Sequence, residues 1–345
     1  MAQGGGRERV DGPVIDGLIF YSDGDPGPLL DGGVNAINLT CANPLATLAS
    51  AVDEMATWVR RAGLPDARWR IVREVGDIAR ARSEGRMGLI LGWQNILPIE
   101  NQLDRLALFH GLGLRVIQLS YNEASLVADG CLERRPVGLT AFGRTVVAEM
   151  NRLGLAIDLS HCAETVALEC AEISTRPILV THANARAVFE QPRNKSDEVI
   201  RAVAGTGGVI GLSIHGFMNW DGDPAHPSTL AGFVDNVRHV RDLVGMEHIG
   251  IGTDFSSLSR PDAADFFLSM SKEKYHGTAG AYIAAFGNTL EGRYPAEACR
   301  PQEYPRIFDA LADAGFSDAE ITAVAGGNFL RALDRIWQGD PGAGS

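Results

Sequence analysis

Short apolar runs alternate along this chain with longer segments in which apolar residues recur at every third or fourth position. The short runs are typical of buried strands, and the longer segments are typical of helices with one apolar face. Leu48, Val52, Met55 and Val59, for example, share one face of the segment 47–62. The pattern predicts strands at 14–19, 36–40, 87–91, 116–119, 155–159, 178–180, 209–214 and 249–252.

Helical segments follow most of these strands. We expect helices at 47–62, 77–84, 99–112, 140–153, 164–174, 196–204, 229–244, 304–314 and 318–337. A repeated order of strand and then helix implies a parallel sheet, and eight such units favour a closed barrel over an open sheet. The sequence therefore predicts an α/β fold, namely a (β/α)8 TIM barrel.

One domain over residues 1–345 is expected, because this length is usual for such a barrel with a few added elements. Residues 1–12 are expected to be a flexible lead. Residues 256–300 lack a regular pattern, and we interpret them as a lid or a subunit interface. Residues 304–337 are expected to form C-terminal helices.

Composition narrows the classes of partner. The chain is 45% hydrophobic and 21% charged, as in ordinary globular proteins, and its net charge is −12. Such a surface makes nucleic acid a poor partner. We find neither an apolar run long enough to cross a membrane nor an apolar core in the first residues that would indicate a secretory signal. Five scattered cysteines fit reduced thiols, so we expect a cytoplasmic protein.

Polar side chains gather where the expected strands end. His161 and His182 follow the neighbouring strands 155–159 and 178–180, which one helix connects. Parallel neighbours lie about 4.8 Å apart, so histidines at the same ends of both can converge on one ion or substrate. Parallel α/β folds carry their chemistry at these ends. The same reasoning adds Gln94, Asn95, Tyr121, Asn122, His215 and Asp254.

Five segments together resemble the membrane dipeptidase family, also called renal dipeptidase-like or peptidase family M19. They are VIDG at 14–17, the run 139–161, VTHANARAVFEQPRN at 180–194, IGIGTDF at 249–255 and GGNFLRAL at 326–333. The resemblance implies a barrel of the amidohydrolase type, a metallo-dependent hydrolase with two metal ions. Matching positions imply that His161 and His182 are metal ligands and that Arg193 binds the substrate carboxylate. Asp254 matches the family's aspartate after the last strand.

Three departures from the family pattern set this chain apart. The family's first ligand pair, His-x-Asp, is here Leu18 and Phe20, and its bridging glutamate is here Gln94. Tyr121 stands where the family has a histidine that polarises the substrate carbonyl. Leucine and phenylalanine cannot bind a metal, so the first metal site is expected to be absent. With DGL, GWQN and PRNKSDE, the chain resembles a divergent bacterial subgroup that lacks this pair.

A degraded metal centre leaves several readings open. We interpret the chain as an M19-like hydrolase of an amide or related C–N bond in a small substrate that carries a carboxylate. His161 and His182 would hold at most one divalent ion, with zinc the leading candidate, and a metal-free site is an equal alternative. The alternatives are a metal-independent isomerase or lyase that uses Asp254 and the histidine pair, and a non-catalytic barrel that binds a ligand. A homodimer is compatible with each reading.

Roles follow from this interpretation. The expected catalytic residues are Asp254, His161, His182 and Tyr121. The expected substrate-binding residues are Arg193, Gln94, Asn95, Asn122 and His215. Asp254 is the best candidate for a general base or acid, because a carboxylate at a strand end can exchange a proton with the substrate.

Overall fold

The computed structural model describes residues 8–21, 24–256, 278–287 and 289–338. Within these residues the sheet closes on itself, because β1 pairs in parallel with β2 on one side and with β9 on the other. The strands around the barrel are β1 (Ile15–Phe20), β2 (Ala36–Thr40), β4 (Met87–Trp93), β5 (Leu114–Gln118), β6 (Ala156–Asp158), β7 (Leu179–Val180), β8 (Val209–Leu212) and β9 (Ile249–Ile251). They match the eight expected strands in order, which confirms the (β/α)8 barrel.

Two short strands were not predicted. β3 (Trp69–Ile71) pairs with β4 away from the path of the barrel, and β10 (Phe255–Ser256) pairs with the end of β1. Neither strand has a continuous apolar run, so the pattern of hydrophobic residues could not reveal them. Their conformation is fixed by pairing with a neighbouring strand that is distant in sequence.

Most helices begin and end within two residues of the expected positions. They are α3 (Leu48–Ala62), α4 (Val75–Ser83), α6 (Ala141–Leu153), α7 (Glu164–Ile173), α8 (Asp197–Gly205), α9 (Leu230–Val244) and α13 (Pro305–Asp313). Hydroxyl side chains cap several of them: Thr47, Thr140 and Thr229 each accept a hydrogen bond from the backbone N–H three residues ahead.

Two expected helices differ from the structure. The segment 99–112 is helical only as α5 (Arg105–Leu112), after the 3-10 turn η1 (Leu97–Ile99), because Glu100 has a left-handed φ of 52° that ends the turn. The segment 318–337 consists of α14 (Asp318–Thr322), the π-helical turn η4 (Ala323–Gly327) and α15 (Asn328–Trp337). At Gly326 a side chain would collide with the carbonyl of Pro13, so the first strand packs directly against this break.

The expected irregular segment 256–300 lies partly outside the described residues. Its described part contains the helices α11 (Thr278–Phe286) and α12 (Leu290–Arg293), which the sequence pattern did not indicate. A further short helix, α2 (Gly27–Asp31), was also not expected. Of the expected flexible lead, Asp11 is described, and its N–H donates to the hydroxyl of Thr322.

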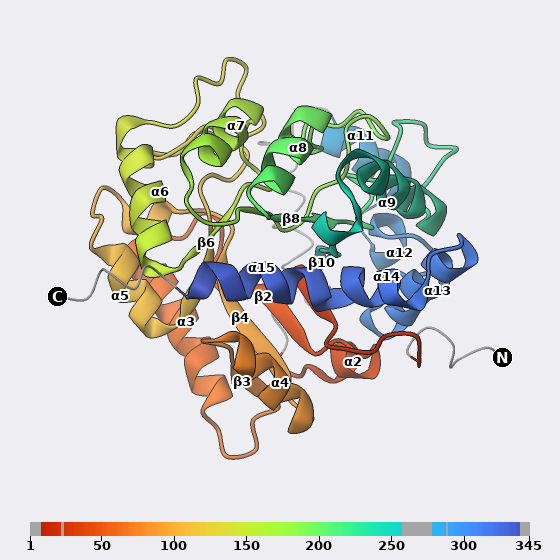
Figure 1. The fold of residues 1–345 in the computed structure, drawn as a ribbon, viewed down its shortest axis with the longest axis horizontal. Helices are drawn as coiled ribbons and strands as arrows, with labels where there is room; N and C mark the ends of the chain where they lie inside the picture. Colours follow the sequence, from red (N-terminus) through yellow and green to blue (C-terminus); the bar gives the residue numbers. More distant parts are fainter. Residues whose placement is uncertain (1–7, 22–23, 257–277, 288, 339–345) are drawn as a thin grey trace.

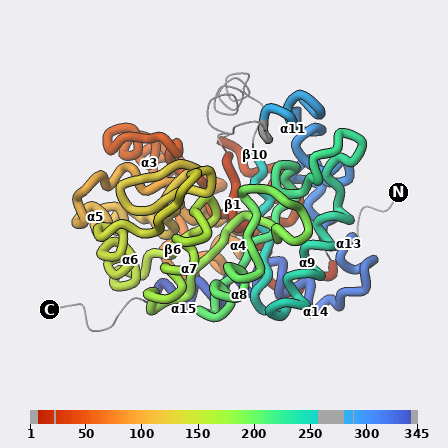
Figure 2. Tube along the Cα trace, turned by 90° about the horizontal axis from the view of Figure 1, so that it is seen from above, coloured from red at the N-terminus to blue at the C-terminus, as the bar shows by residue number. Residues whose placement is uncertain are grey.

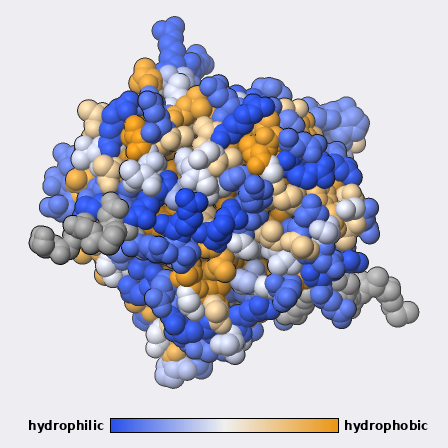
Figure 3. Space-filling view, viewed as in Figure 1, coloured by the Kyte–Doolittle hydropathy of each residue, from blue (hydrophilic) through white to orange (hydrophobic). Residues whose placement is uncertain are grey.

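α15 closes the amino-terminal end of the barrel. Figure 1 shows it crossing the middle of the molecule in front of the strands, and Figure 2 shows it at the lower edge, on the side opposite β10. Phe329, Leu333 and Ile336 of this helix pack against Ile15 and Val209 at the start of their strands. The face seen in Figure 3 is largely hydrophilic with small separate hydrophobic patches. The carboxyl ends of the strands, where the candidate residues lie, point to the opposite end.

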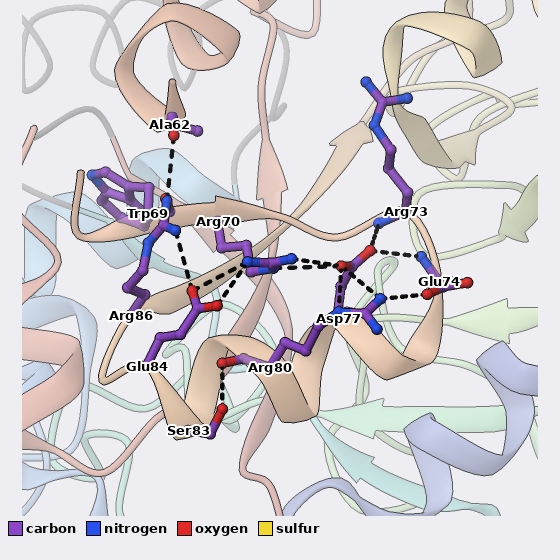
Figure 4. A network of polar contacts seen from close by, with 10 residues as sticks. All are labelled: Ala62, Trp69, Arg70, Arg73, Glu74, Asp77, Arg80, Ser83, Glu84 and Arg86. Carbon is purple, nitrogen blue, oxygen red and sulfur yellow. Dashed lines mark hydrogen bonds and ion pairs between the residues drawn. The ribbon is translucent and has the colours of Figure 1, made fainter. Parts of the chain in front are cut away.

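A network of charged side chains fixes α4 against β3. The carboxylate of Asp77, one of the buried charged residues, accepts hydrogen bonds from the backbone N–H groups of Arg73 and Glu74. The guanidinium groups of Arg70 and Arg80 contact the same carboxylate from opposite sides (Figure 4). This network lies on elements that supply none of the candidate site residues, so we assign it to stability.

Candidate functional site

The structure brings His161 and His182 into contact. They follow β6 and β7, which pair in parallel through Asp158 and Leu179. Their Nε2 atoms are 3.0 Å apart, and both rings are almost completely buried. Burial lowers the pKa of each imidazole well below its usual value, and the nearby guanidinium of Arg193 lowers it further. Both rings are therefore neutral at neutral pH.

Hydrogen bonds behind the pair hold His182 in one orientation. The carboxylate of Asp158 accepts from the hydroxyl of Thr181 at 2.7 Å, and that hydroxyl lies 2.8 Å from Nδ1 of His182. The same carboxylate accepts from the backbone N–H groups of Ser160 and Thr181. Asp158 therefore joins the ends of β6 and β7 and orients the histidine through one hydroxyl.

The opposite wall of the barrel repeats this arrangement. Asp16 of β1 accepts from the hydroxyl of Thr253 at 2.6 Å and from the backbone N–H groups of Leu18 and Thr253. The bond joins Asp16, near the beginning of β1, to Thr253 just after β9, and Asp254 follows directly. A buried aspartate thus fixes the strand end next to each candidate catalytic group. In the sequence each appears only as an aspartate within an apolar strand, a pattern that does not reveal its partner.

Tyr121 and Asn122 enclose the other side of His161. The ring of Tyr121 stacks on the imidazole with centroids 4.3 Å apart, and Oδ1 of Asn122 lies 2.6 Å from Nδ1. Asn122 has a left-handed φ of 64°, and its Nδ2 has no hydrogen-bond partner within the described residues. Strained backbone and an unpaired buried amide are features that ligand sites show more often than structural positions.

Asp254 also has left-handed backbone, with φ 57°, at the end of β9. Its N–H donates to the carbonyl of Leu18 across the β1–β9 junction, and its side chain is partly exposed. Desolvation raises the pKa of its carboxyl group to about 7, although the guanidinium groups of Arg193 and Arg293 oppose this rise. Asp254 is therefore poised to gain or lose a proton near neutral pH.

His215 follows β8 and is buried beside this carboxylate-bearing strand end. The backbone N–H of Phe217 donates to its Nδ1 at 3.2 Å, so the neutral ring carries its proton on Nε2. Burial, and next the charge of Arg293, lower the pKa of His215 well below its usual value. A neutral imidazole with Nε2–H can donate a hydrogen bond to a substrate.

The guanidinium of Arg193 is already engaged with the backbone. Its Nη1 donates to the carbonyl of Ser160, and its Nη2 donates to the carbonyl of His182 at 3.0 Å. Arg193 therefore clamps the ends of β6 and β7, a role that the sequence did not indicate. Its remaining N–H groups are those that could reach a carboxylate. Arg293 of α12, a second buried arginine, was missed because its segment has no regular pattern.

Gln94 and Asn95 follow β4 at the same end of the barrel. Nε2 of Gln94 donates to the hydroxyl of Thr40 at 2.7 Å, and its backbone carbonyl accepts from Gln118. Gln94 is thus held by the neighbouring strands on both sides. Oδ1 of Asn95 is buried and has no hydrogen-bond partner in the part of the chain that the structure describes. Asn95 can therefore accept a hydrogen bond from a ligand.

These residues do not fit a two-metal centre. Leu18, one of the positions of the expected first ligand pair, is buried and apolar, and Gln94 supplies a neutral amide that is bonded to Thr40. Over residues 8–21, 24–256, 278–287 and 289–338, we find no group of three His, Cys, Asp or Glu side chains placed to hold a metal ion. His161 and His182 face each other as a pair without a third such ligand, whereas catalytic zinc usually has three protein ligands.

Comparison with known proteins shows the family to which this chain belongs. A family model described as membrane dipeptidase (peptidase family M19) matches residues 29–264. Dipeptidase verJ of Clonostachys rogersoniana is 33% identical over 269 residues, which cover 77% of this chain and 59% of that protein. Dipeptidase tcpJ of Claviceps purpurea is 26% identical over 78% of this chain and 56% of its own length. The chain thus spans little more than half the length of these relatives.

A solved structure is similar over nearly its full length. An amidohydrolase from Pseudomonas aeruginosa has a TM-score of 0.82 and 29% identity, covering 96% of this chain and 98% of that one. A metallopeptidase from Rhodobacter sphaeroides, bound to a phosphinate mimic of L-Ala-D-Ala, has a TM-score of 0.74 over 94% and 99% of the two chains. At 21% identity, the second likeness shows the fold alone. No helix among the described residues is both long and apolar enough to span a membrane.

Proposed function

Because this chain belongs to the membrane dipeptidase family, peptidase family M19, we propose that it hydrolyses an amide or related C–N bond in a small substrate that carries a carboxylate. Dipeptides and N-acylated amino acids are substrates of this kind. The alignment with the Pseudomonas aeruginosa amidohydrolase over almost the whole chain supports an amide as the bond that is cleaved.

One observation carries the proposal: Asp254 presents a partly exposed carboxylate, with a pKa of about 7, at the end of a barrel strand. In its ionised form it accepts a proton from a water molecule while the oxygen of that water adds to the substrate carbonyl carbon. The C–N bond then breaks, and the same proton passes to the leaving nitrogen, so atoms and charges balance. Such proton transfer typically contributes about 10²–10⁴ to a rate.

The neighbouring residues are assigned to binding and orientation. Neutral His161 and His182 hydrogen-bond the reacting amide, and Tyr121 fixes the ring of His161 by stacking. His215 donates from Nε2, and Asn95 and Asn122 use their unpaired amide atoms. Arg193 contacts the substrate carboxylate through the N–H groups that it does not donate to the strand-end carbonyls. Gln94 braces the end of β4 beside them.

A degraded metal centre is part of the proposal. The pair His161 and His182 would hold at most one divalent ion, and the acid–base role of Asp254 does not depend on it. The buried Leu18 and the bonded amide of Gln94 support the loss of the first metal site.

The test incubates the purified full chain with a panel of dipeptides and N-acylated amino acids. The release of free amine measures hydrolysis. The wild type should cleave part of the panel, Asp254→Asn should lose this activity, and the exposed control Asp242→Asn should retain it. If nothing is cleaved, but the α-hydrogen of a carboxylate substrate exchanges with D2O in an Asp254-dependent way, the isomerase or lyase reading replaces hydrolysis. Failure of both reactions contradicts an acid–base role for Asp254.

A further inference from the structure

A pocket lies next to the site, between the beginnings of α7 and α8. These two helices pack side by side in both Figure 1 and Figure 2. The pocket has a volume of about 180 Å³ and is lined by residues that include Cys131, Cys162, Glu164, Arg186, Lys195 and Ser196. None of the residues assigned above to hydrolysis lines it. It is therefore a separate site on the same end of the barrel.

The pocket contains a buried cation that no carboxylate of the described residues contacts directly. Lys195 is 3% exposed, and its Nζ donates to the carbonyl of Cys162 at 3.0 Å. Among the described residues no carboxylate lies within ion-pair distance of it, and the charge of Asp158 acts on its pKa only from further away. Glu164, the acidic group of the pocket, is instead bonded to Arg186 at 2.8 Å and to the hydroxyl of Ser196 at 2.6 Å. The charged side chains of the lining therefore sum to one excess positive charge.

A buried ammonium in this state is costly unless a partner compensates its lost hydration. The backbone of Lys195 is fixed, because its N–H donates to the carbonyl of Asn184 and its carbonyl accepts from the N–H of Arg186. Lys195 is the one lysine among the described residues, whose other basic side chains with a permanent charge are arginines. The sequence contains two more lysines, Lys272 and Lys274. A compact ammonium with spare N–H donors is thus fixed in a pocket large enough for a small molecule.

We propose that this pocket binds a small monocarboxylate, with the ammonium of Lys195 as its counter-ion. One excess positive charge matches one carboxylate. A dianion such as phosphate would bring a second negative charge close to Glu164, which disfavours it. This site does not depend on the proposed hydrolysis, and it would remain if the reaction were of another class.

The pocket is linked to the histidine pair through its wall. The N–H of Cys131 donates to the carbonyl of His161 at 2.8 Å, and its thiol lies 3.6 Å from Oδ1 of Asn122. That oxygen is the atom 2.6 Å from Nδ1 of His161. A carboxylate bound beside Lys195 would therefore stabilise the segment that carries His161, which gives the site a route by which it can affect the reaction.

Titration of the full chain with sodium acetate and sodium propionate, at constant ionic strength in chloride, tests the site by calorimetry. Wild type should bind one carboxylate per chain, and Lys195→Gln should bind it at least about tenfold more weakly, as for the loss of a charged hydrogen bond. Lys195→Arg should retain part of the affinity, and the exposed control Arg152→Gln should match wild type. Equal binding by wild type and Lys195→Gln, or no binding by wild type, overturns the proposal.

A second measurement locates the ligand and remains valid if Lys195→Gln fails to fold. Reductive methylation of the wild type, followed by peptide mass spectrometry, reports the rate at which each lysine is modified. Saturating propionate should slow the modification of Lys195 but not that of Lys272 or Lys274. An unchanged rate at Lys195 excludes a carboxylate there, and stronger protection by inorganic phosphate than by propionate contradicts a site for a single negative charge.

Discussion

The Nε2 atoms of His161 and His182 lie 3.0 Å apart, and the residues behind them determine which atom carries the proton. Thr181 gives its hydroxyl hydrogen to Asp158, so it must accept from Nδ1 of His182. Neutral His182 therefore has a lone pair on Nε2. Oδ1 of Asn122 accepts from Nδ1 of His161, so neutral His161 also has a lone pair on Nε2. Two lone pairs thus face each other across 3.0 Å, an arrangement that a proton or a cation between the rings would stabilise.

This pair predicts the metal content of the protein. Because no third ligand accompanies the histidines within the described residues, we expect at most one divalent ion per chain and weaker retention than in a three-ligand zinc site. Elemental analysis of protein purified without added metal, before and after dialysis against a chelator, measures the stoichiometry. Two tightly retained ions per chain would contradict our reading of Leu18, Phe20 and Gln94.

The pKa of Asp254 predicts the pH dependence of the reaction. Desolvation raises this pKa to about 7, and a general base works only when it is ionised. We therefore expect kcat/KM to fall as the pH drops through about 7 and to level off above it. The measurement is a pH profile with the best substrate of the panel. A profile that stays flat down to pH values near an ordinary aspartate pKa, about 3.9, would remove Asp254 from the base role.

Arg193→Lys separates binding from support of the barrel. Lysine keeps the charge but not the fork that reaches the carbonyls of Ser160 and His182, so the melting temperature should fall. If Arg193 also contacts the substrate carboxylate, binding of that substrate should weaken by about 1.5–3 kcal/mol. The matched control is an amidated substrate that lacks the carboxylate, whose KM should change much less. A lower melting temperature with an equal change in both KM values assigns Arg193 to structure alone.

Restoring the family's ligands should not restore a two-metal dipeptidase. In the triple variant Leu18→His, Phe20→Asp and Gln94→Glu, the new groups at positions 18 and 94 would be buried, and the new carboxylate at position 20 would be half-buried. Tyr121 would still occupy the place of the family's carbonyl-polarising histidine. We expect little added metal and little cleavage of simple dipeptides, measured by elemental analysis and amine release. Recovery of both would show that the site has lost only its ligands.

Asp77 should support stability in a pH-dependent way. Burial alone would raise the pKa of its carboxyl group, but hydrogen bonds from the N–H of Arg73 and from Arg80 outweigh burial and lower it (Figure 4). A carboxyl with a lowered pKa stabilises the fold above its unfolded pKa of about 3.9 and loses this effect as the pH falls through its folded pKa. Asp77→Ala should therefore cost about 1–3 kcal/mol at pH 7.

Urea unfolding at pH 7 and at about pH 3.5 measures this difference. The gap between wild type and Asp77→Ala should narrow at the lower pH, whereas the exposed control Asp242→Ala should change little at either pH. A gap that is equal at both pH values would show that Asp77 contributes through packing or neutral hydrogen bonds.

The hydrophobic pattern by itself determined the barrel and the end at which chemistry lies. Eight apolar runs separated by amphipathic helices leave a closed parallel sheet as the compatible arrangement, and the residues that follow each run must gather at one end. His161, His182, His215 and Asp254 could be placed there for that reason. The sequence could not reveal β3 or β10, because pairing with a distant strand creates them.

Tertiary structure alone decided what each polar group contacts. Arg193 matches a carboxylate-binding position in the resemblance, yet its side chain reaches the carbonyls of two strand ends. In the sequence, Lys195 is only one residue of the segment PRNKSDE. The fold buries its side chain beside the carbonyl of Cys162, with no carboxylate of the described residues in direct contact. Burial and charge balance depend on residues far apart in the chain, so a local pattern can name the candidates but cannot determine their partners, their pKa values or the proton on His182.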